Sequence, residues 1–161
     1  MNTSSKFVVA THILTALQIL RERGLEAVTS DFLAESVNTN PVVIRRILGR
    51  LRKNELVVSQ VGAGGGFSLG RSAGSITLLD VHRAVEDSSL FHFHYREPNQ
   101  LCPVGCTIQD ALKGVFSEAE ISVEAVLRSR TILQISSEME ATEKFQELES
   151  AAIAEGRAPM P

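Results

Sequence analysis

The chain has 161 residues, 43% hydrophobic and 22% charged, with a net charge of −3, which is typical of a folded protein with a compact head and an appended helical arm. No apolar run is long enough to span a bilayer, the N-terminus lacks a secretory cleavage pattern, and two cysteines are too few for a secreted disulfide scaffold, so we expect a cytoplasmic protein with no membrane partner. The charge is uneven: residues 1–75 hold nine Lys and Arg against five Asp and Glu, while residues 117–149 hold three against eight, which favours a basic working face in the N-terminal half.

Two helices are expected before residue 40. Apolar residues at helical spacing predict a mostly buried helix over residues 4–22, with Gly24 as its stop. A shorter helix is expected over residues 30–37, capped by Thr29 or Ser30.

The next predicted helix, over residues 40–53, is basic and amphipathic. Asn40 can accept from the free amide groups of the first turn, and Pro41 fits the first helical position. No acidic residue interrupts the segment, and Gly49 removes side-chain bulk from the outer side, so that a backbone or a phosphate can approach closely. The apolar stripe is Ile44, Ile47, Leu48 and Leu51; the outer side is Val42, Arg46, Gly49, Arg50 and Lys53, flanked by Arg45 and Arg52.

A hairpin is expected after this helix, with strands over residues 56–60 and 67–69. The turn between them, GAGGG, requires positive φ at several positions. A nucleotide-binding loop is excluded, because the third glycine of GxGxxG would fall at Phe67 and no helix follows. A helix-turn-helix followed by such a hairpin is a winged helix, whose second helix enters the major groove while the wing touches the backbone or the minor groove.

The arrangement predicts contact with double-stranded DNA. Arginines neutralise phosphates and can pair bidentately with guanine, and Arg46 is the first candidate for a base contact because it points outward. The predicted contact residues are Asn40, Val42, Arg45, Arg46, Gly49, Arg50, Lys53, Gly62, Gly64 and Gly65.

The C-terminal half is expected to be a helical arm. Thr77 and Asp80 predict a capping box before a helix over residues 78–87, and a long helix is expected to start near Pro103 or Val104. A coiled-coil-like seam along it predicts a dimer interface, formed by Ile108, Leu112, Val115, Ala119, Ser122 and Val126. A partly separate helix is expected over residues 137–150. The predicted organisation is a head over 1–88, a cysteine loop over 89–105, a dimerisation arm over 106–150 and a disordered tail over 151–161.

The pair Cys102 and Cys106 is a candidate thiol sensor at the expected junction of head and arm. Cys106 is expected in the first turn of a helix, where free amides and the helix dipole favour the thiolate. Oxidation could join it to Cys102 or to a cysteine of a partner, although four-residue spacing in a regular helix suits a disulfide poorly. His92 and His94 complete a formal four-ligand zinc set with the cysteines, but the spacing matches no common zinc pattern.

The chain resembles the Rrf2 family of bacterial transcriptional regulators, which includes IscR, NsrR and CymR, and is most similar to its YwnA-type branch. The resemblance rests on LGRLRKNELV, GAGGGFSLGRSAGSITLLDVHRAVE and the later CPVG. It implies a homodimer, often a repressor, on a palindromic operator, with residues 40–50 as recognition helix and 62–66 as wing tip. Val61 stands where many members have arginine, and Arg71 is the candidate substitute for that DNA contact.

Cluster-binding members of this family carry three cysteines ahead of the dimer helix, whereas this chain has two, so the resemblance implies no iron–sulfur cofactor. His12 stands about where some relatives complete a cluster from the partner's first helix; the alternative is a structural histidine.

These observations predict a mostly α protein with a small β-hairpin wing, a winged helix-turn-helix head and a long dimerisation helix. The expected function is a sequence-specific DNA-binding transcriptional regulator, expected to be a repressor and thiol-responsive, and not an enzyme, because no catalytic constellation stands out. Two alternatives stay open: an iron–sulfur or zinc protein in metal sensing or electron transfer, and an adaptor that binds a protein through its acidic arm.

Overall fold

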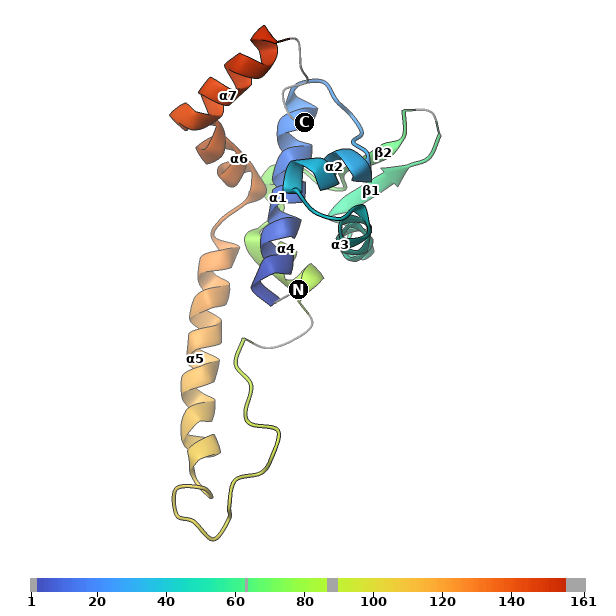
Figure 1. The fold of residues 1–161 in the computed structure, drawn as a ribbon. Coiled ribbons are helices and arrows are strands. Elements are labelled where there is room, and N and C mark those ends of the chain that lie inside the picture. The colour runs from blue at the N-terminus through green and yellow to red at the C-terminus, as the bar shows by residue number, and fades with distance from the viewer. Residues whose placement is uncertain (1–2, 63, 87–89, 156–161) are drawn as a thin grey trace.

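The computed structural model describes residues 3–62, 64–86 and 90–155, and it consists of a head and a long arm (Figure 1). The predicted mostly α winged helix-turn-helix with a β-hairpin is confirmed. Its elements in chain order are α1 (Thr3–Glu22), α2 (Ser30–Val37), α3 (Pro41–Lys53), β1 (Val57–Gln60), β2 (Gly66–Leu69), the 3₁₀ turn η1 (Ala73–Ser75), α4 (Leu78–Val85), α5 (Ile108–Arg128), α6 (Ile132–Glu140) and α7 (Glu143–Ala154).

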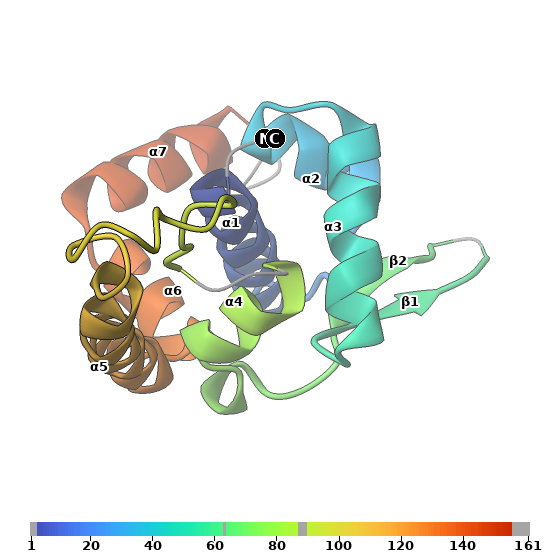
Figure 2. The same ribbon diagram turned by 90° about the horizontal axis from the view of Figure 1, so that it is seen from below.

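The first helix, α1, is the centre of the head. It is buried continuously from Ile13 to Leu20, and it contacts α2, α3, α4, α6 and β2. Viewed from below, these elements surround it (Figure 2). Because so much apolar surface is removed from water around one helix, α1 holds the other elements of the head in fixed positions.

The helix-turn-helix, α2 and α3, begins at the two caps that its sequence predicts. The Thr29 hydroxyl accepts from the Phe32 amide, and the Asn40 side chain accepts from the Val42 amide at 2.8 Å, with Pro41 at the first helical position. The predicted apolar stripe of α3 is buried in the core: Ile44, Ile47, Leu48 and Leu51. This burial fixes which side of α3 faces solvent.

The wing is a two-stranded antiparallel sheet in which Val57 pairs with Leu69 and Gln60 with Gly66. It is attached to the head by a bridge between Val28 and Phe67, whose amides and carbonyls exchange hydrogen bonds of 2.8 and 2.9 Å. Gly66 lies against this bridge, because a Cβ added there would sit 2.6 Å from the Val28 carbonyl oxygen. The hairpin therefore projects from a rigid base.

The C-terminal end of the arm is joined to the head by paired capping boxes. Thr77 with Asp80 caps α4 as predicted, and Thr131 with Gln134 caps α6. The two capping threonines form an isolated β-bridge, in which the Leu78 amide donates to the Arg130 carbonyl at 2.8 Å. The arm thus leaves the head at a fixed point.

The predicted boundaries after the arm helix are wrong. In place of one helix over residues 137–150 there are two, α6 and α7, separated near Thr142, whose side chain caps α7. Ile132 of α6 is fully buried in the head core and α6 packs on α1, so α6 belongs to the head rather than to the arm. The expected disordered tail begins too early, because α7 continues to Ala154; residues 156–161 lie outside the described residues.

The arm itself consists of α5 and the irregular segment 90–107 that runs beside it (Figure 1). At 1.5 Å per residue, a 21-residue helix is about 30 Å long. Phe116 of α5 stacks with Phe91 at 4.9 Å between ring centroids and lies 5.2 Å from Phe93. Arg83 of α4 pairs with Glu124 near the head at 2.8 Å. One side of α5 is therefore occupied by its own chain.

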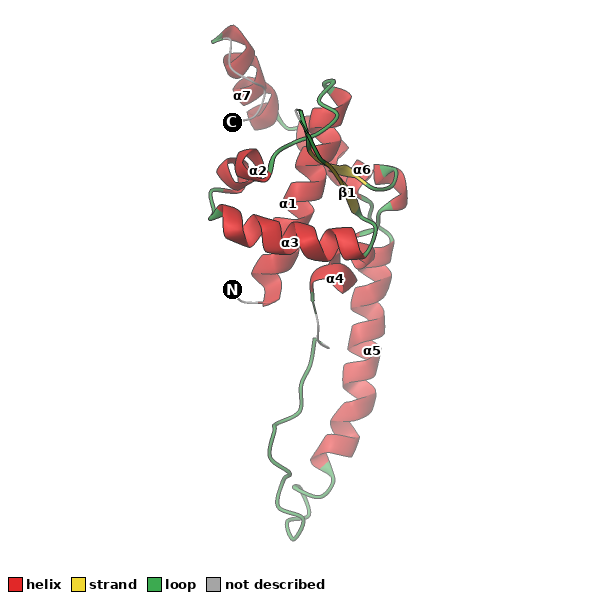
Figure 3. Ribbon diagram, turned by 90° about the vertical axis from the view of Figure 1, so that its right-hand side faces the viewer, coloured by secondary structure: helices red, strands yellow, loops and turns green. Residues whose placement is uncertain are grey.

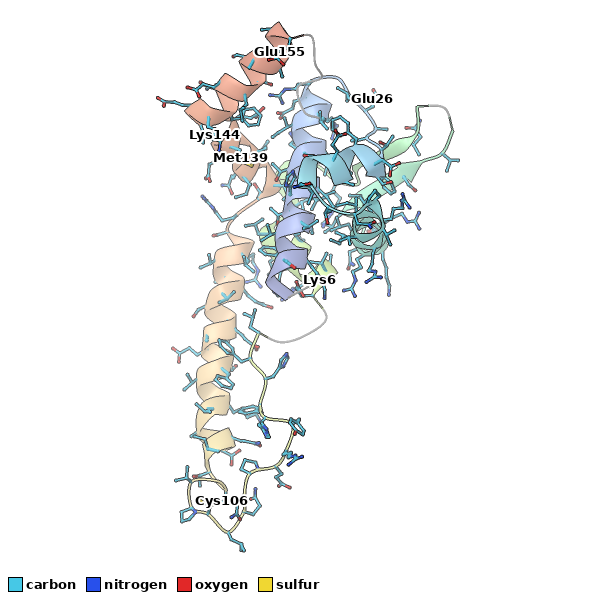
Figure 4. All side chains as sticks on the ribbon, viewed as in Figure 1. Lys6, Glu26, Cys106, Met139, Lys144 and Glu155 are labelled. Carbon is cyan, nitrogen blue, oxygen red and sulfur yellow. The ribbon has the colours of Figure 1, made fainter. Side chains whose placement is uncertain are left out.

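Two expectations about the cysteines are corrected by this arrangement. The helix starts at Ile108, so Cys106 lies in the turn before it and not in its first turn. Cys106 also lies at the far end of the arm, away from the head, rather than at their junction (Figure 4). Segment 90–107 runs from the head to the far end of the arm, and α5 then runs back to the head. Only the C-terminal end of α5 therefore lies at the junction of head and arm.

Candidate nucleic-acid interface

The outer side of α3 is the exposed basic surface of the head. Viewed from below, α3 lies on the side of the head away from α5, with the wing projecting next to it (Figure 2). From the side, α3 crosses α1 while the arm points away from it (Figure 3). The predicted residues Val42, Arg45, Arg46, Gly49 and Lys53 are all exposed on this helix. The structure therefore brings these five predicted helix contacts to one accessible face.

Two cations on this face, Arg46 and Lys53, are not engaged by the protein. Both side chains are exposed, and among the described residues neither has a hydrogen-bond or ion-pair partner. No acidic residue is present in α3. These two charges are therefore available to neutralise phosphates.

Arg45 and Arg52 are held by exposed partners. Arg45 reaches the Asp31 carboxylate at 3.2 Å and the Ser30 hydroxyl at 3.3 Å, and Arg52 donates to the Ser59 hydroxyl at 3.3 Å. Exposed contacts of this kind contribute little stability, so they can be exchanged for a phosphate. Ser59 of β1 was not among the predicted site residues; its contact with Arg52 joins the end of α3 to the wing.

Two predicted contact residues have structural roles. Arg50 is half-buried and donates to the Val85 carbonyl at 2.7 Å, which links α3 to the end of α4. The Asn40 side-chain oxygen is used by the cap of α3. A DNA contact from either residue would have to come from its remaining donors or from the backbone.

The wing tip is shaped by its glycines in two different ways. Gly62 and Gly64 have φ of +112° and +77°, as the sequence predicts. Gly65 does not have a positive φ. Glycine is needed at this position for another reason, because a Cβ there would lie 2.4 Å from the Gln60 carbonyl oxygen. Val61 is 96% exposed, so the tip presents an apolar side chain next to its glycines.

Arg71, the candidate substitute for a wing arginine, follows β2 and lies at the base of the wing rather than at its tip. Its guanidinium is 3.7 Å from the Asp80 carboxylate in the first turn of α4. Both side chains are partly exposed, so this pair leaves Arg71 able to reach outward.

The histidines and cysteines do not form a metal site within the part of the chain that the structure describes, where no group of three or more His, Cys, Asp and Glu side chains is placed to hold an ion. The Cys106 amide donates to the Cys102 carbonyl at 2.9 Å, neither cysteine is in a disulfide, and the Cys106 thiol donates to the Pro103 carbonyl at 3.3 Å. His94 accepts from the Arg96 amide at 3.2 Å. His12 is far from these residues in the fold, where its ring nitrogen bonds the Ser36 hydroxyl at 3.0 Å and burial lowers its pKa.

No helix in the described ranges is long and apolar enough to cross a membrane.

Comparison with known proteins identifies relatives along most of the chain. Residues 3–138 match the Rrf2 family, described as "Iron-dependent Transcriptional regulator". The chain is 36% identical over 132 residues to the HTH-type transcriptional regulator YwnA of Bacillus subtilis (strain 168), covering 82% of this chain and 95% of YwnA.

Solved structures agree with this match. A transcriptional regulator from Lactobacillus plantarum is 25% identical, with a TM-score of 0.69 over 91% of this chain and 97% of its own. IscR of T. potens is also 25% identical, with a TM-score of 0.61 over 86% of this chain and 85% of its own. The similarity therefore covers both the head and the arm.

Iron dependence is part of the family's description, but the described residues of this single chain supply no group of three His, Cys, Asp or Glu ligands for an iron group. The loop beside α5 supplies two cysteines, and no third His, Cys, Asp or Glu of the described residues joins them in a ligand group. We therefore assign no step to a metal.

Proposed function

Because the chain belongs to the Rrf2 family of transcriptional regulators and is of the YwnA type, we propose that it binds a palindromic operator as a homodimer and acts as a repressor. The observation that carries this proposal is the acid-free outer face of α3, on which Arg46 and Lys53 have no partner among the described residues. A helix face that only contacts solvent is expected to carry acidic as well as basic side chains, whereas α3 carries only basic ones.

In the proposed complex, α3 lies in the major groove and the wing contacts the adjacent backbone. Arg46, at the outer face, would read a base, while Lys53 and the two tethered arginines, Arg45 and Arg52, would neutralise phosphates. Gly49 would allow α3 to lie close to the DNA. The wing has no arginine at its tip, so α3 carries most of the affinity.

Pairing of two chains is proposed along α5. Over its 21 residues none is buried, which is costly for an amphipathic helix that stays single. Its free side carries Val115 and Val126, which are 59% and 65% exposed, together with Ile108. Together with Leu112, Ala119 and Ser122, these residues follow one another at alternating intervals of four and three from Ile108 to Val126, a spacing that fits a second helix.

The cysteine turn is proposed as the point where a signal acts. A hydroperoxide would oxidise the thiols of Cys102 and Cys106, or of one chain and its partner, to a disulfide, and would itself be reduced to an alcohol and water. Because the turn lies at the far end of α5, the signal would act on the heads through the pairing of the arms. If the double variant Cys102→Ser/Cys106→Ser and the wild type bind DNA equally before and after oxidation, this part is wrong.

Selection of genomic DNA by the purified protein, reduced and oxidised, tests the function. The proposal predicts enrichment of an inverted repeat whose half-sites are one helical turn or a multiple apart. An adaptor that uses its acidic arm would enrich no sequence. Visible absorption and metal analysis of anaerobically purified protein would reveal an iron–sulfur or zinc protein.

A further inference from the structure

An acidic side chain, Asp31 of α2, lies beside the exposed basic face of α3. Its Oδ1 is 3.2 Å from Nη2 of Arg45, and the Ser30 hydroxyl accepts from Nε of the same guanidinium at 3.3 Å. Among the described residues, Arg45 is the only exposed cation of α3 that is paired with a carboxylate. The face that is proposed to meet DNA phosphates therefore has an anion of the protein next to it.

The fold has little need of this carboxylate. The N-cap of α2 is supplied by Thr29, whose hydroxyl accepts from the Phe32 amide. The side chains of Asp31 and Arg45 are 73% and 56% exposed, and a pair exposed to this extent contributes little stability. The remaining structural role of Asp31 is a favourable negative charge in the first turn of α2. That role alone would not change how the protein binds DNA.

The geometry of the pair places Asp31 close to any phosphate that Arg45 contacts. The carboxylate would lie within about 6–8 Å of that phosphate, which is the sum of the two contacts across one guanidinium. This distance is shorter than the Debye length of about 10 Å at 0.1 M salt, so the repulsion between the two anions is not screened. Arg45 must either share its donors between both anions or leave Asp31 unpaired beside the DNA.

From these observations we propose that Asp31 limits the affinity of the head for DNA by competing with a phosphate for Arg45. This inference rests on the proposed function, because it requires the outer face of α3 to lie on DNA. Phosphate contacts supply essentially all of the binding to arbitrary sequences. A carboxylate in this position therefore keeps the protein from binding tightly to DNA that lacks its operator. The effect depends on the charge of Asp31 and not on its shape.

The Asp31→Asn variant removes the charge and keeps the shape of the side chain. Binding of the full chain to a fluorescein-labelled random-sequence duplex is measured by anisotropy over a range of salt concentrations. The variant should bind more tightly, and its slope of log Kobs against log salt concentration should be steeper by up to about 0.9 for each head on the DNA. With two heads, lowering the salt from about 0.3 M to about 0.1 M should widen the affinity ratio of variant to wild type about sevenfold.

Two control variants separate the charge of Asp31 from other effects. Asp31→Glu keeps the charge and should bind with the affinity and slope of the wild type. Glu147→Gln removes the same charge from an exposed position of α7, which lies across α1 from α3 (Figure 2), and it should also match the wild type. Denaturant unfolding of each variant shows that the compared proteins are folded.

Three results would overturn the proposal. Asp31→Asn with the affinity and slope of the wild type would leave Asp31 with only its role at the start of α2. Weaker binding of Asp31→Asn would show that Asp31 holds Arg45 in its DNA-binding position, and an equal gain in Glu147→Gln would show a general effect of net charge. A wild type that binds no duplex would instead refute the proposed function, and this inference with it.

Discussion

Replacing Gly49 with alanine separates the needs of the helix from the needs of the DNA interface. Gly49 lies inside α3, is exposed, and has an ordinary helical conformation; a Cβ added there meets no atom within 4 Å among the described residues. The fold therefore gives no reason for glycine at this position. Glycine inside a helix costs about 0.8–1.0 kcal/mol relative to alanine, so the variant should be more stable.

The expected stability gain is about 0.5–1 kcal/mol per chain, which raises Tm by about 1–4 °C for a chain of this size. DNA binding should change in the opposite direction, because the added methyl group keeps α3 away from the groove. A loss of about 0.7 kcal/mol at each of two half-sites gives about tenfold weaker binding. Thermal unfolding and fluorescence anisotropy on a selected duplex, at fixed protein and salt concentrations, measure the two effects.

Gly114→Ala is the matched control, since Gly114 is also inside a helix, α5, and a Cβ there likewise meets no atom within 4 Å. It should give the same gain in stability with unchanged DNA affinity. If Gly49→Ala is more stable and binds the duplex as tightly as the wild type, Gly49 does not face DNA, and the placement of α3 in the groove is refuted.

Three further predictions concern the support of the interface. Arg50→Ala removes the bond to the buried Val85 carbonyl and should destabilise the head by about 1–2 kcal/mol, whereas Arg46→Ala should stay within about 0.5 kcal/mol; equal losses in denaturant unfolding would contradict the assigned roles. Gly66→Ala should displace the wing, because its Cβ would lie 2.6 Å from the Val28 carbonyl oxygen. Hydrogen exchange at the Phe67 amide, which donates to that carbonyl, should therefore become faster, and an unchanged exchange rate would contradict this prediction. His12 has a pKa below its usual 6.5, so the unfolded chain binds more protons there and stability should fall as pH drops below about 6.5; His12→Gln should weaken this dependence, and an unchanged pH profile would contradict it.

Local rules were sufficient to predict the helix-turn-helix of the head and its helix caps. The caps at Thr29, Asn40 and Thr77 and the apolar stripe of α3 are local patterns, and each is found in the structure. The turn glycines were only partly predictable. Positive φ at Gly62 and Gly64 follows from residue type, but the need for Gly65 comes from the approach of the Gln60 carbonyl, which sequence spacing does not show.

Contacts between distant segments account for what the sequence did not predict. The assignment of α6 to the head depends on the burial of Ile132 beside α1, more than a hundred residues away in the chain. Arg46 and Arg50 are both arginines on the predicted outer side of the helix, and only the hydrogen bond from Arg50 to the Val85 carbonyl distinguishes their roles. The cysteine turn was expected at the junction because it precedes the arm helix in sequence, yet the chain first runs the length of that helix.

The most direct test of the central claim is the salt dependence of binding to a selected duplex, compared between the wild type and the double variant Arg46→Ala/Lys53→Ala. Each phosphate contact contributes about −0.9 to the slope of log Kobs against log salt concentration. If both residues contact phosphates in both copies of the dimer, the variant's slope should be shallower by about 3.6, and by about 1.8 if Arg46 reads a base instead. A slope equal to that of the wild type would show that the exposed face of α3 does not lie on DNA.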